Sequence, residues 1–152
     1  MGFADDINRF AKIAVGNSNT VVRRTIIDIS QRVIARTPVG DAKYWQSNPP
    51  EGYVGGHARA NWSLSINAPV VKEYKAIDGS KAEQNISLRR IKKIITNKTG
   101  ATDGVYYVQN SVPYIEVLED GHSKNQAPNG MVAVTAAEFE GIVSTNVDKV
   151  KK

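Results

Sequence analysis

The stretch TVVRRTIIDISQRVIARTP, residues 20–38, carries the strongest periodic pattern in the chain. Its apolar side chains repeat at steps of four, three and four, at Val22, Ile26, Ile29 and Val33. This spacing places them on one face of an α-helix, with charged residues on the other faces. Because a residue that precedes proline is disfavoured in the α region, the pattern predicts an amphipathic helix that ends before Thr37-Pro38.

A second helical pattern lies upstream, in residues 3–15. Phe3, Ile7, Phe10 and Ala11 recur at helical spacing, and then Gly16-Asn17-Ser18-Asn19 interrupts the repeat. Glycine, asparagine and serine are common at helix ends. We therefore expect a helical N-terminal region, residues 3–37, that is broken at residues 16–19.

The segment that follows, residues 38–57, is dense in glycine and proline and contains three aromatic residues. We expect a long loop without regular structure, and loops of this length inside compact domains are usually functional. Protein interfaces are enriched in tyrosine and tryptophan. The loop therefore offers Trp45 and Tyr53 as candidate interface residues.

Shorter elements make up the rest of the chain. The segment from Trp62 alternates, with Leu64 and Ile66 on the same side, which predicts a strand with one buried face. Residues 79–95 have the pattern of a helix with Ser80 as its N-cap. The segments GVYYVQN, residues 104–110, and YIEVLE, residues 114–119, are predicted strands. The last predicted element, Met131 to Val150, is an amphipathic helix with this apolar face: Val132, Ala136, Phe139, Val143, Val147 and Val150.

These elements predict an α+β fold, a small, mostly antiparallel sheet flanked by long N-terminal and C-terminal amphipathic helices. We expect a single domain, residues 1–152, in four parts. They are a helical region at 3–37, a long loop at 38–57, a sheet with an inserted helix at 58–130, and a helix at 131–150. A chain of 152 residues is long enough to bury a sizeable core.

The composition argues against several classes of protein. The chain has no cysteine, so disulfides and thiolate chemistry are not available to it. Its formal net charge of +5 is basic, but it is not the charge of a dedicated nucleic-acid binder. The first residues have no secretory apolar region, and no apolar run approaches membrane-spanning length. We therefore expect a cytosolic product with no membrane partner.

The stretch EDGH, residues 119–122, poses the main chemical question. His122 beside Glu119 and Asp120 could bind a metal. A catalytic zinc site usually has three protein ligands, however, and the only other histidine is His57, far away in sequence. We therefore favour a turn over a metal site.

In that turn, Gly121 can adopt the positive φ that the backbone needs at the end of the preceding strand. Asn129 or Gly130 then serves as the N-cap of the last helix. The Glu119 carboxylate would hold backbone N–H groups of the turn, or a basic side chain of a neighbouring subunit. This predicts a structural acid and not a catalytic one.

No other motif indicates an active site. The serines lack a GxSxG elbow, and the glycines match neither a P-loop nor a GxGxxG fingerprint. We expect no catalytic residue, cofactor or metal, and we expect that the chain is not an enzyme. The cluster RRIKK is either the solvated face of a helix, which we favour, or a surface that faces DNA phosphates. Its basic residues are Arg89, Arg90, Lys92 and Lys93.

Several phrases together carry a family signal: TPVGDAKYW, GYVGGHARANW, NSVPYIEVLEDGHSKNQAPNGMV and the helix that follows. They resemble the HK97 gp10-like family of tailed-bacteriophage tail-completion or neck proteins. The matching positions are Thr37, Pro38, Val39, Gly56, Asn61, Trp62, Asn110, Pro113, Tyr114, Leu118, Glu119, Gly121, Ser123, Ala127, Pro128, Gly130, Met131 and Val132. The resemblance spans residues 21–143 with an unmatched middle at 68–100, and residues 122–126 are longer than the family pattern.

The resemblance implies a structural virion protein, a ring subunit at the head–tail junction that is needed for tail assembly and head–tail joining. Such a protein is assembled in the host cytoplasm. The implied partners are further copies of the chain, with a six-fold ring favoured over a twelve-fold one, portal or head-completion proteins, and tail terminator or tail tube proteins. Packaged DNA in the ring lumen is a further implied neighbour. From the residues alone, the alternative is a DNA-binding protein that uses the basic helix at residues 89–93.

Overall fold

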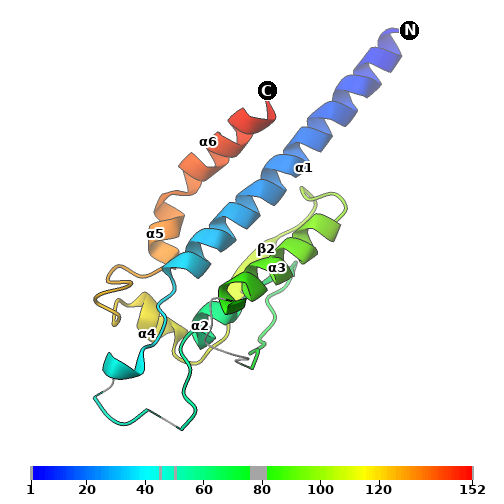
Figure 1. The fold of residues 1–152 in the computed structure, drawn as a ribbon. Helices are drawn as coiled ribbons and strands as arrows, with labels where there is room; N and C mark the ends of the chain where they lie inside the picture. Colours follow the sequence, from blue (N-terminus) through cyan, green and yellow to red (C-terminus); the bar gives the residue numbers. More distant parts are fainter. Residues whose placement is uncertain (1, 45, 50, 76–81, 152) are drawn as a thin grey trace.

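One long helix, α1, forms the axis of the fold (Figure 1). The structure is a computed structural model that describes residues 2–44, 46–49, 51–75 and 82–151. Helix α1 runs from Phe3 to Arg36, 34 residues, which is about 51 Å at the rise of an α-helix. The next residue, Thr37, has extended backbone angles of φ −67° and ψ 125°. This confirms the helix end that Pro38 predicts.

The predicted break at residues 16–19 is wrong, because α1 continues through it without interruption. The polar side chains of this segment hydrogen-bond within the helix instead of capping an end. The Ser18 hydroxyl donates to the Ala14 carbonyl at 3.0 Å, and the Thr20 hydroxyl donates to the Gly16 carbonyl at 2.9 Å. A single glycine inside a helix costs only about 0.5–1 kcal/mol relative to alanine, which a long helix tolerates.

Gly16→Ala tests this continuity. Within a helix, alanine is favoured over glycine by about 1 kcal/mol, and a Cβ built at Gly16 meets no described atom within 4 Å. We expect the variant to show greater helicity by far-UV circular dichroism and no loss of thermal stability. Gly141→Ala, at another helical glycine with open space around its Cβ, is the matched control. Lower helicity in the Gly16 variant alone would indicate a capped break.

The sheet consists of two antiparallel strands, β1 from Trp62 to Ile66 and β2 from Tyr106 to Asn110. Trp62 pairs with Asn110 at one end of the ladder and Ile66 pairs with Tyr106 at the other. Between the strands, helix α3, Ala82–Asn97, packs against both α1 and β1. The strand at Trp62 and the inserted helix are therefore confirmed, and the strand predicted at 104–110 is confirmed over residues 106–110. Ser80, the predicted cap of that helix, lies outside the described residues.

Two short helical turns and a loop connect α1 to the sheet. The loop contains a 3-10 helix, η1, at Ala42–Tyr44, and helix α2, His57–Ala60, leads directly into β1. Gly56 precedes α2 with φ at +102°, in the left-handed region that glycine adopts without strain. Apart from η1 and His57, the first residue of α2, the described part of the loop expected at 38–57 is irregular.

The segment YIEVLE, predicted as a strand, is instead helix α4, Ile115–Glu119. Its two residues that pack on the core are Ile115 and Leu118, three positions apart, while Val117 between them is exposed. A spacing of three brings side chains to one face of a helix but to opposite faces of a strand. Core packing therefore selects the helix over the β propensity of a short valine- and isoleucine-containing segment.

The predicted C-terminal helix is divided into α5, Val132–Ala137, and α6, Phe139–Val150. Glu138 separates them with φ −91° and ψ −2°. The residues that bury against the rest of the chain are not those of the predicted apolar face. They are Met131, Thr135, Ile142 and Asn146, whereas Val132 and Phe139 of that face are 47% and 49% exposed.

Polar contacts to α1 hold α5 and α6 in this orientation. The Glu138 carboxylate accepts hydrogen bonds from Arg32 at 2.6 Å and from Arg36 at 2.7 Å. The buried amide of Asn146 donates to Asp28 at 2.8 Å. These bonds rotate the helices so that part of their apolar face remains uncovered.

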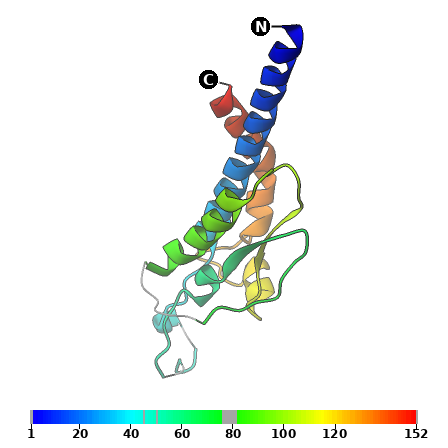
Figure 2. The same ribbon diagram turned by 90° about the vertical axis from the view of Figure 1, so that its right-hand side faces the viewer.

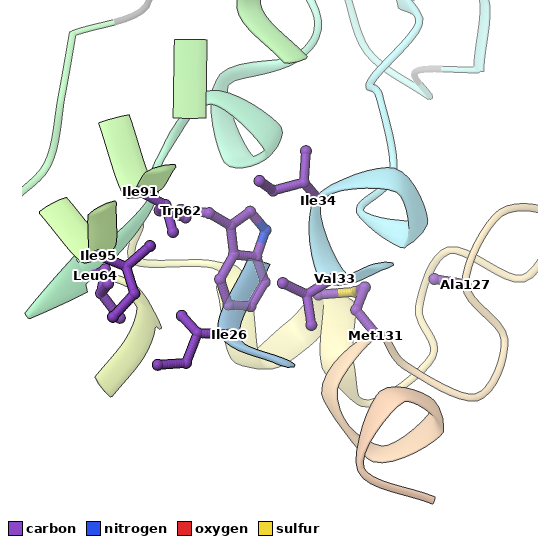
Figure 3. Close-up of a cluster of buried hydrophobic side chains, with 9 residues drawn as sticks. All are labelled: Ile26, Val33, Ile34, Trp62, Leu64, Ile91, Ile95, Ala127 and Met131. Carbon is purple, nitrogen blue, oxygen red and sulfur yellow. The ribbon is translucent and has the colours of Figure 1, made fainter. Parts of the chain in front are cut away.

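The core lies between α1, the sheet and α3 (Figure 3). Figures 1 and 2 show α1 in the middle, with α5 and α6 along one side and the sheet with α3 along another. The architecture is α+β, as the sequence predicts. The buried apolar cluster comprises Ile26, Val33, Ile34, Trp62, Leu64, Ile91, Ile95, Ala127 and Met131. In the part of the chain that the structure describes, no helix is both long and apolar enough to cross a membrane.

Candidate functional site

Trp62 and Thr37 are two of the residues on which the family resemblance rests, and their side chains are in contact in the core. The indole N–H of Trp62 donates to the Thr37 hydroxyl at 2.7 Å, and that hydroxyl donates to the Val33 carbonyl at 2.6 Å. Arg59 then donates to the Thr37 carbonyl at 2.7 and 2.9 Å. The end of α1, where Pro38 follows, is thereby joined to α2 and β1. These polar groups shape the subunit.

Asn61 and Asn110 fix neighbouring loops in the same way. The buried Asn61 side chain donates to the His57 carbonyl at 2.8 Å and to the Tyr74 carbonyl at 3.0 Å, and it accepts from the Tyr74 N–H at 2.6 Å. The Asn110 amide donates to the Ala58 carbonyl at 2.7 Å. Asn61 supplies partners to the backbone of Tyr74, and the Asn110 amide adds a second donor to the Ala58 carbonyl, which also accepts from the Asn61 N–H.

Glu119 caps the N-terminus of α5. Its carboxylate accepts hydrogen bonds from the backbone N–H groups of Met131, Val132 and Ala133 at 2.8, 2.9 and 2.8 Å. The N-cap position is Met131, so the prediction of Asn129 or Gly130 as the cap is wrong. The first of the two predicted roles of Glu119, as a holder of backbone N–H groups, is confirmed.

These hydrogen bonds determine how Glu119 titrates. Burial raises the pKa of its carboxyl, but the three N–H donors at Val132, Ala133 and Met131 together outweigh burial, so the pKa lies below its usual range. The positive end of the helix dipole acts in the same direction. Glu119 is therefore an ionised structural cap.

Two glycines make the approach of Glu119 to α5 possible. Gly121 has φ at +82° and follows α4 in a Schellman arrangement, in which the His122 N–H donates to the Val117 carbonyl. A Cβ at Gly121 would fall against the Pro128 carbonyl oxygen. Gly130 has φ at +77°, and a Cβ there would lie 2.6 Å from the Glu119 carboxylate. The positive φ predicted for Gly121 is confirmed, although the element it ends is a helix.

Pro113 and Tyr114 stand at the start of α4, where Tyr114 is the N-cap residue. The tyrosine side chain is 42% exposed. Burial raises the pKa of the Tyr114 hydroxyl, and the nearby Tyr53 and Glu73 act in the same direction. Proline suits a position just before a helix because its φ is fixed and it has no N–H to satisfy. Both residues are exposed, as expected at the end of a loop.

The two histidines lie in different surroundings. His122 is exposed, whereas the ring of His57 contacts Glu73 at 2.6 Å. Within residues 2–44, 46–49, 51–75 and 82–151, no three His, Cys, Asp or Glu side chains are grouped so that they could hold a metal ion. The hydrogen bonds of Glu119 to the start of α5 give the 119–132 stretch its role in helix capping.

Of the two interface candidates in the loop, Trp45 lies outside the described residues. Tyr53 is half-buried, with its hydroxyl directly over Gly40. Val39 at the start of the loop exchanges two hydrogen bonds with the Gln126 side chain, at 2.9 and 3.0 Å. The base of the loop is therefore anchored on the subunit, and a role of Tyr53 at an interface stays a prediction.

The basic cluster on α3 is divided between two environments. Arg90 is half-buried, donates to the Ala60 carbonyl at 2.9 Å and lies 3.6 Å from the centre of the Tyr74 ring. Arg89, Lys92 and Lys93 are exposed. Arg90 thus has a structural role in joining α3 to α2, and contact of the cluster with DNA stays a prediction.

A feature that the sequence reasoning missed is an apolar groove of about 450 Å³. Residues of α1, the sheet, α5 and α6 line it: Ile29, Val33, Trp62, Val108, Val132, Thr135, Ala136 and Phe139. The sequence does contain part of the groove, because Val132, Ala136 and Phe139 belong to the apolar face predicted for the last helix. Whether the chain itself covers that face is decided by tertiary packing.

Neither the models of protein families nor the curated proteins nor the solved structures provide a match to this chain. The resemblance to phage tail-completion and neck proteins therefore stays a prediction from the quoted phrases.

Proposed function

We propose that this chain is a structural virion protein of a tailed bacteriophage, a ring subunit of the tail-completion or neck type at the head–tail junction. It would assemble with further copies of itself in the host cytoplasm. Portal or head-completion proteins on one side, and tail terminator or tail tube proteins on the other, would be its neighbours. In the ring, the exposed lysines of α3 are available to face packaged DNA.

The observation that carries this proposal is the amount of apolar surface that the described chain leaves uncovered. Large exposed apolar patches on a protein mark surfaces for association. Here Phe10 is 71% exposed, and Val132 and Phe139 at the apolar groove are each about half exposed. A subunit designed to be enclosed by neighbours in an assembly has such surfaces.

The roles of the residues that carry the family resemblance support the same function. Asn61, Trp62, Asn110 and Glu119 are all engaged in hydrogen bonds that fix the shape of the subunit. This is the use expected of motif residues in a structural protein. In an enzyme, polar residues of a motif would instead converge on a cleft.

The test is a phage that carries an early stop codon in the gene for this chain. In a non-suppressing host, electron microscopy should show DNA-filled heads and tails that are not joined, or tails of incomplete form. A plasmid copy of the gene should restore the titre, and the same plasmid with a stop codon is the matched control. Normal infectious particles without the protein would refute the proposed function.

A further inference from the structure

The N-terminal half of α1 projects beyond the rest of the subunit (Figures 1 and 2). Every described side chain from Ala4 to Ser18 is exposed. Packing begins near Asn19, whose side chain accepts a hydrogen bond from the Thr102 N–H at 2.9 Å. About 16 residues of helix, or roughly 24 Å at 1.5 Å per residue, therefore extend without tertiary support. We refer to residues 3–18 as the free half of α1.

This free half is amphipathic even though the described chain leaves it uncovered. Ile7, Phe10, Ala11 and Ala14 lie at positions i, i+3, i+4 and i+7 of the helix. That spacing is the anchor pattern of a helix that binds in an apolar groove. Ile7 is 50% exposed and Phe10 is 71% exposed. In proteins most helical stability comes from packing of an amphipathic face, and the side chains of this stripe are exposed in the described chain.

The apolar groove offers the complementary surface on the same molecule. Ile29 and Val33 of α1 lie on one side of it, and Val132, Ala136 and Phe139 of α5 and α6 lie on the other. Its lining is almost wholly apolar, with Thr135 as the polar exception. The groove can therefore accept a helix through burial of apolar surface, without any unpaired charge.

The free half of α1 cannot enter the groove of its own subunit. Ile29 and Val33 belong to the same continuous helix as Phe10, about 29 and 35 Å farther along its axis at the α-helical rise. A straight helix that forms one wall of a groove cannot also lie within it. The contact must be made between two molecules.

We propose that the free half of α1 of one subunit lies in the apolar groove of a second copy of this chain, with Ile7, Phe10, Ala11 and Ala14 as the anchors. The proposed contact is heterologous: each subunit gives its helix to one neighbour and receives a helix from another. Repetition of such a contact closes into a ring or extends as a filament. The inference deepens the proposed function and rests on it for the ring.

The charges of the free half favour this occupant over a lipid surface. Its polar side includes Asp5 and Asp6 together with Arg9 and Lys12, so two acidic residues balance two basic ones. Helices that lie in a membrane interface are instead rich in lysine and arginine on their polar side. A neutral polar side combined with an apolar stripe suits a protein groove.

Disulfide trapping tests the contact directly, because the chain has no cysteine of its own. Purified Ala11→Cys protein is mixed with purified Ala136→Cys protein under mild oxidation. We expect a covalent dimer in the mixture at a yield at least about tenfold above that in either protein alone. Ala137→Cys, which replaces an exposed residue next to Ala136 outside the groove lining, is the matched control.

The double variant Ala11→Cys with Ala136→Cys distinguishes a head-to-tail contact from a symmetric one. A head-to-tail contact gives a ladder of covalent oligomers or a closed ring. A reciprocal exchange between two copies would stop at a doubly linked dimer of the double variant, and a dimer from Ala11→Cys protein alone would show that two free halves pair with each other. Either result would overturn the proposal. Absence of the mixed dimer would overturn it as well.

Phe10→Ser provides the second measurement. Phe10 is 71% exposed in the subunit, so its loss should leave the unfolding midpoint of the monomer unchanged. Truncation of an interface anchor should weaken self-association at least about tenfold in sedimentation velocity. Ile13→Ser removes another large apolar side chain, 56% exposed, from outside the anchor stripe and is the matched control. Equal effects of the two variants, or a wild-type protein that stays monomeric at every concentration, would refute the contact.

The two proposals fail separately in these experiments. If the disulfide is trapped head to tail but the stop-codon phage forms normal virions, the contact is retained and the virion function is refuted. Unjoined heads and tails in the stop-codon phage, combined with no trapping, would retain the function and refute this surface.

Discussion

Trp62→Ala should lower the free energy of unfolding by about 3–5 kcal/mol, the usual cost of removing a large aromatic side chain from a core. Trp62 is 2% exposed and packs among Val33, Ile34 and the other core residues (Figure 3). The variant also removes the donor to the Thr37 hydroxyl, which lies 2.7 Å from the indole nitrogen. Urea unfolding followed by circular dichroism measures the effect, and we expect poor solubility of the variant.

Trp62→Phe is the matched control, because it retains an apolar ring and removes the N–H donor. Loss of that hydrogen bond should cost about 0.5–1.5 kcal/mol, in addition to a smaller loss of packing. The order wild type, phenylalanine variant, alanine variant is therefore expected for the urea midpoint. An alanine variant with the wild-type midpoint would mean that the indole is not in the core and that β1 is placed wrongly.

Glu119→Gln should destabilise the protein by about 1.5–3 kcal/mol at pH 7, the range for hydrogen bonds to a charged group. The two carboxylate oxygens accept hydrogen bonds from three backbone N–H groups at the start of α5. Glutamine offers only one acceptor oxygen and has no negative charge. Glu116→Gln is the matched control, since Glu116 is an exposed residue of the same short helix α4.

The pH dependence of this effect follows from the lowered pKa of Glu119 in the folded protein. A carboxyl whose pKa is lower in the folded than in the unfolded chain contributes stability above the unfolded pKa, about 4.3 for glutamate. That contribution is lost as the pH falls through the folded pKa. The difference in unfolding free energy between wild type and Glu119→Gln should therefore be constant above about pH 5 and shrink below about pH 4. A difference that does not change with pH would show that the charge has no part in the cap.

Much of the fold follows from local sequence. Pro38 ends α1 because it restricts the residue before it. The alternation from Trp62 and the helical repeat before Asn97 predict β1 and α3 because their apolar residues match the period of the element that buries them. The turn after Glu119 is predictable because Gly121 can adopt positive φ and a lone carboxylate near a helix start is a natural acceptor for its N–H groups.

The elements that the sequence did not predict correctly are those where two local choices are nearly equal in free energy. In residues 16–19, hydrogen bonds of Ser18 and Thr20 to helix carbonyls are as good as a cap, and the helix continues. In residues 115–119, β-branched residues favour a strand, but the positions of Ile115 and Leu118 against the core require a helix. Long-range packing decides the second case, whereas residues 16–18 stay helical although their side chains are exposed.

The sequence alone determined that α1 and the last helix each carry an apolar face, because residue spacing specifies which side chains share a side of a helix. Only the tertiary structure decided whether that face is covered. The bonds of Glu138 to Arg32 and Arg36, and of Asn146 to Asp28, fix the rotation of α5 and α6. That rotation buries Ile142 and leaves Val132 and Phe139 at an open groove. The coverage of an apolar face depends on contacts between residues about a hundred positions apart, and a periodic pattern contains no information on such contacts.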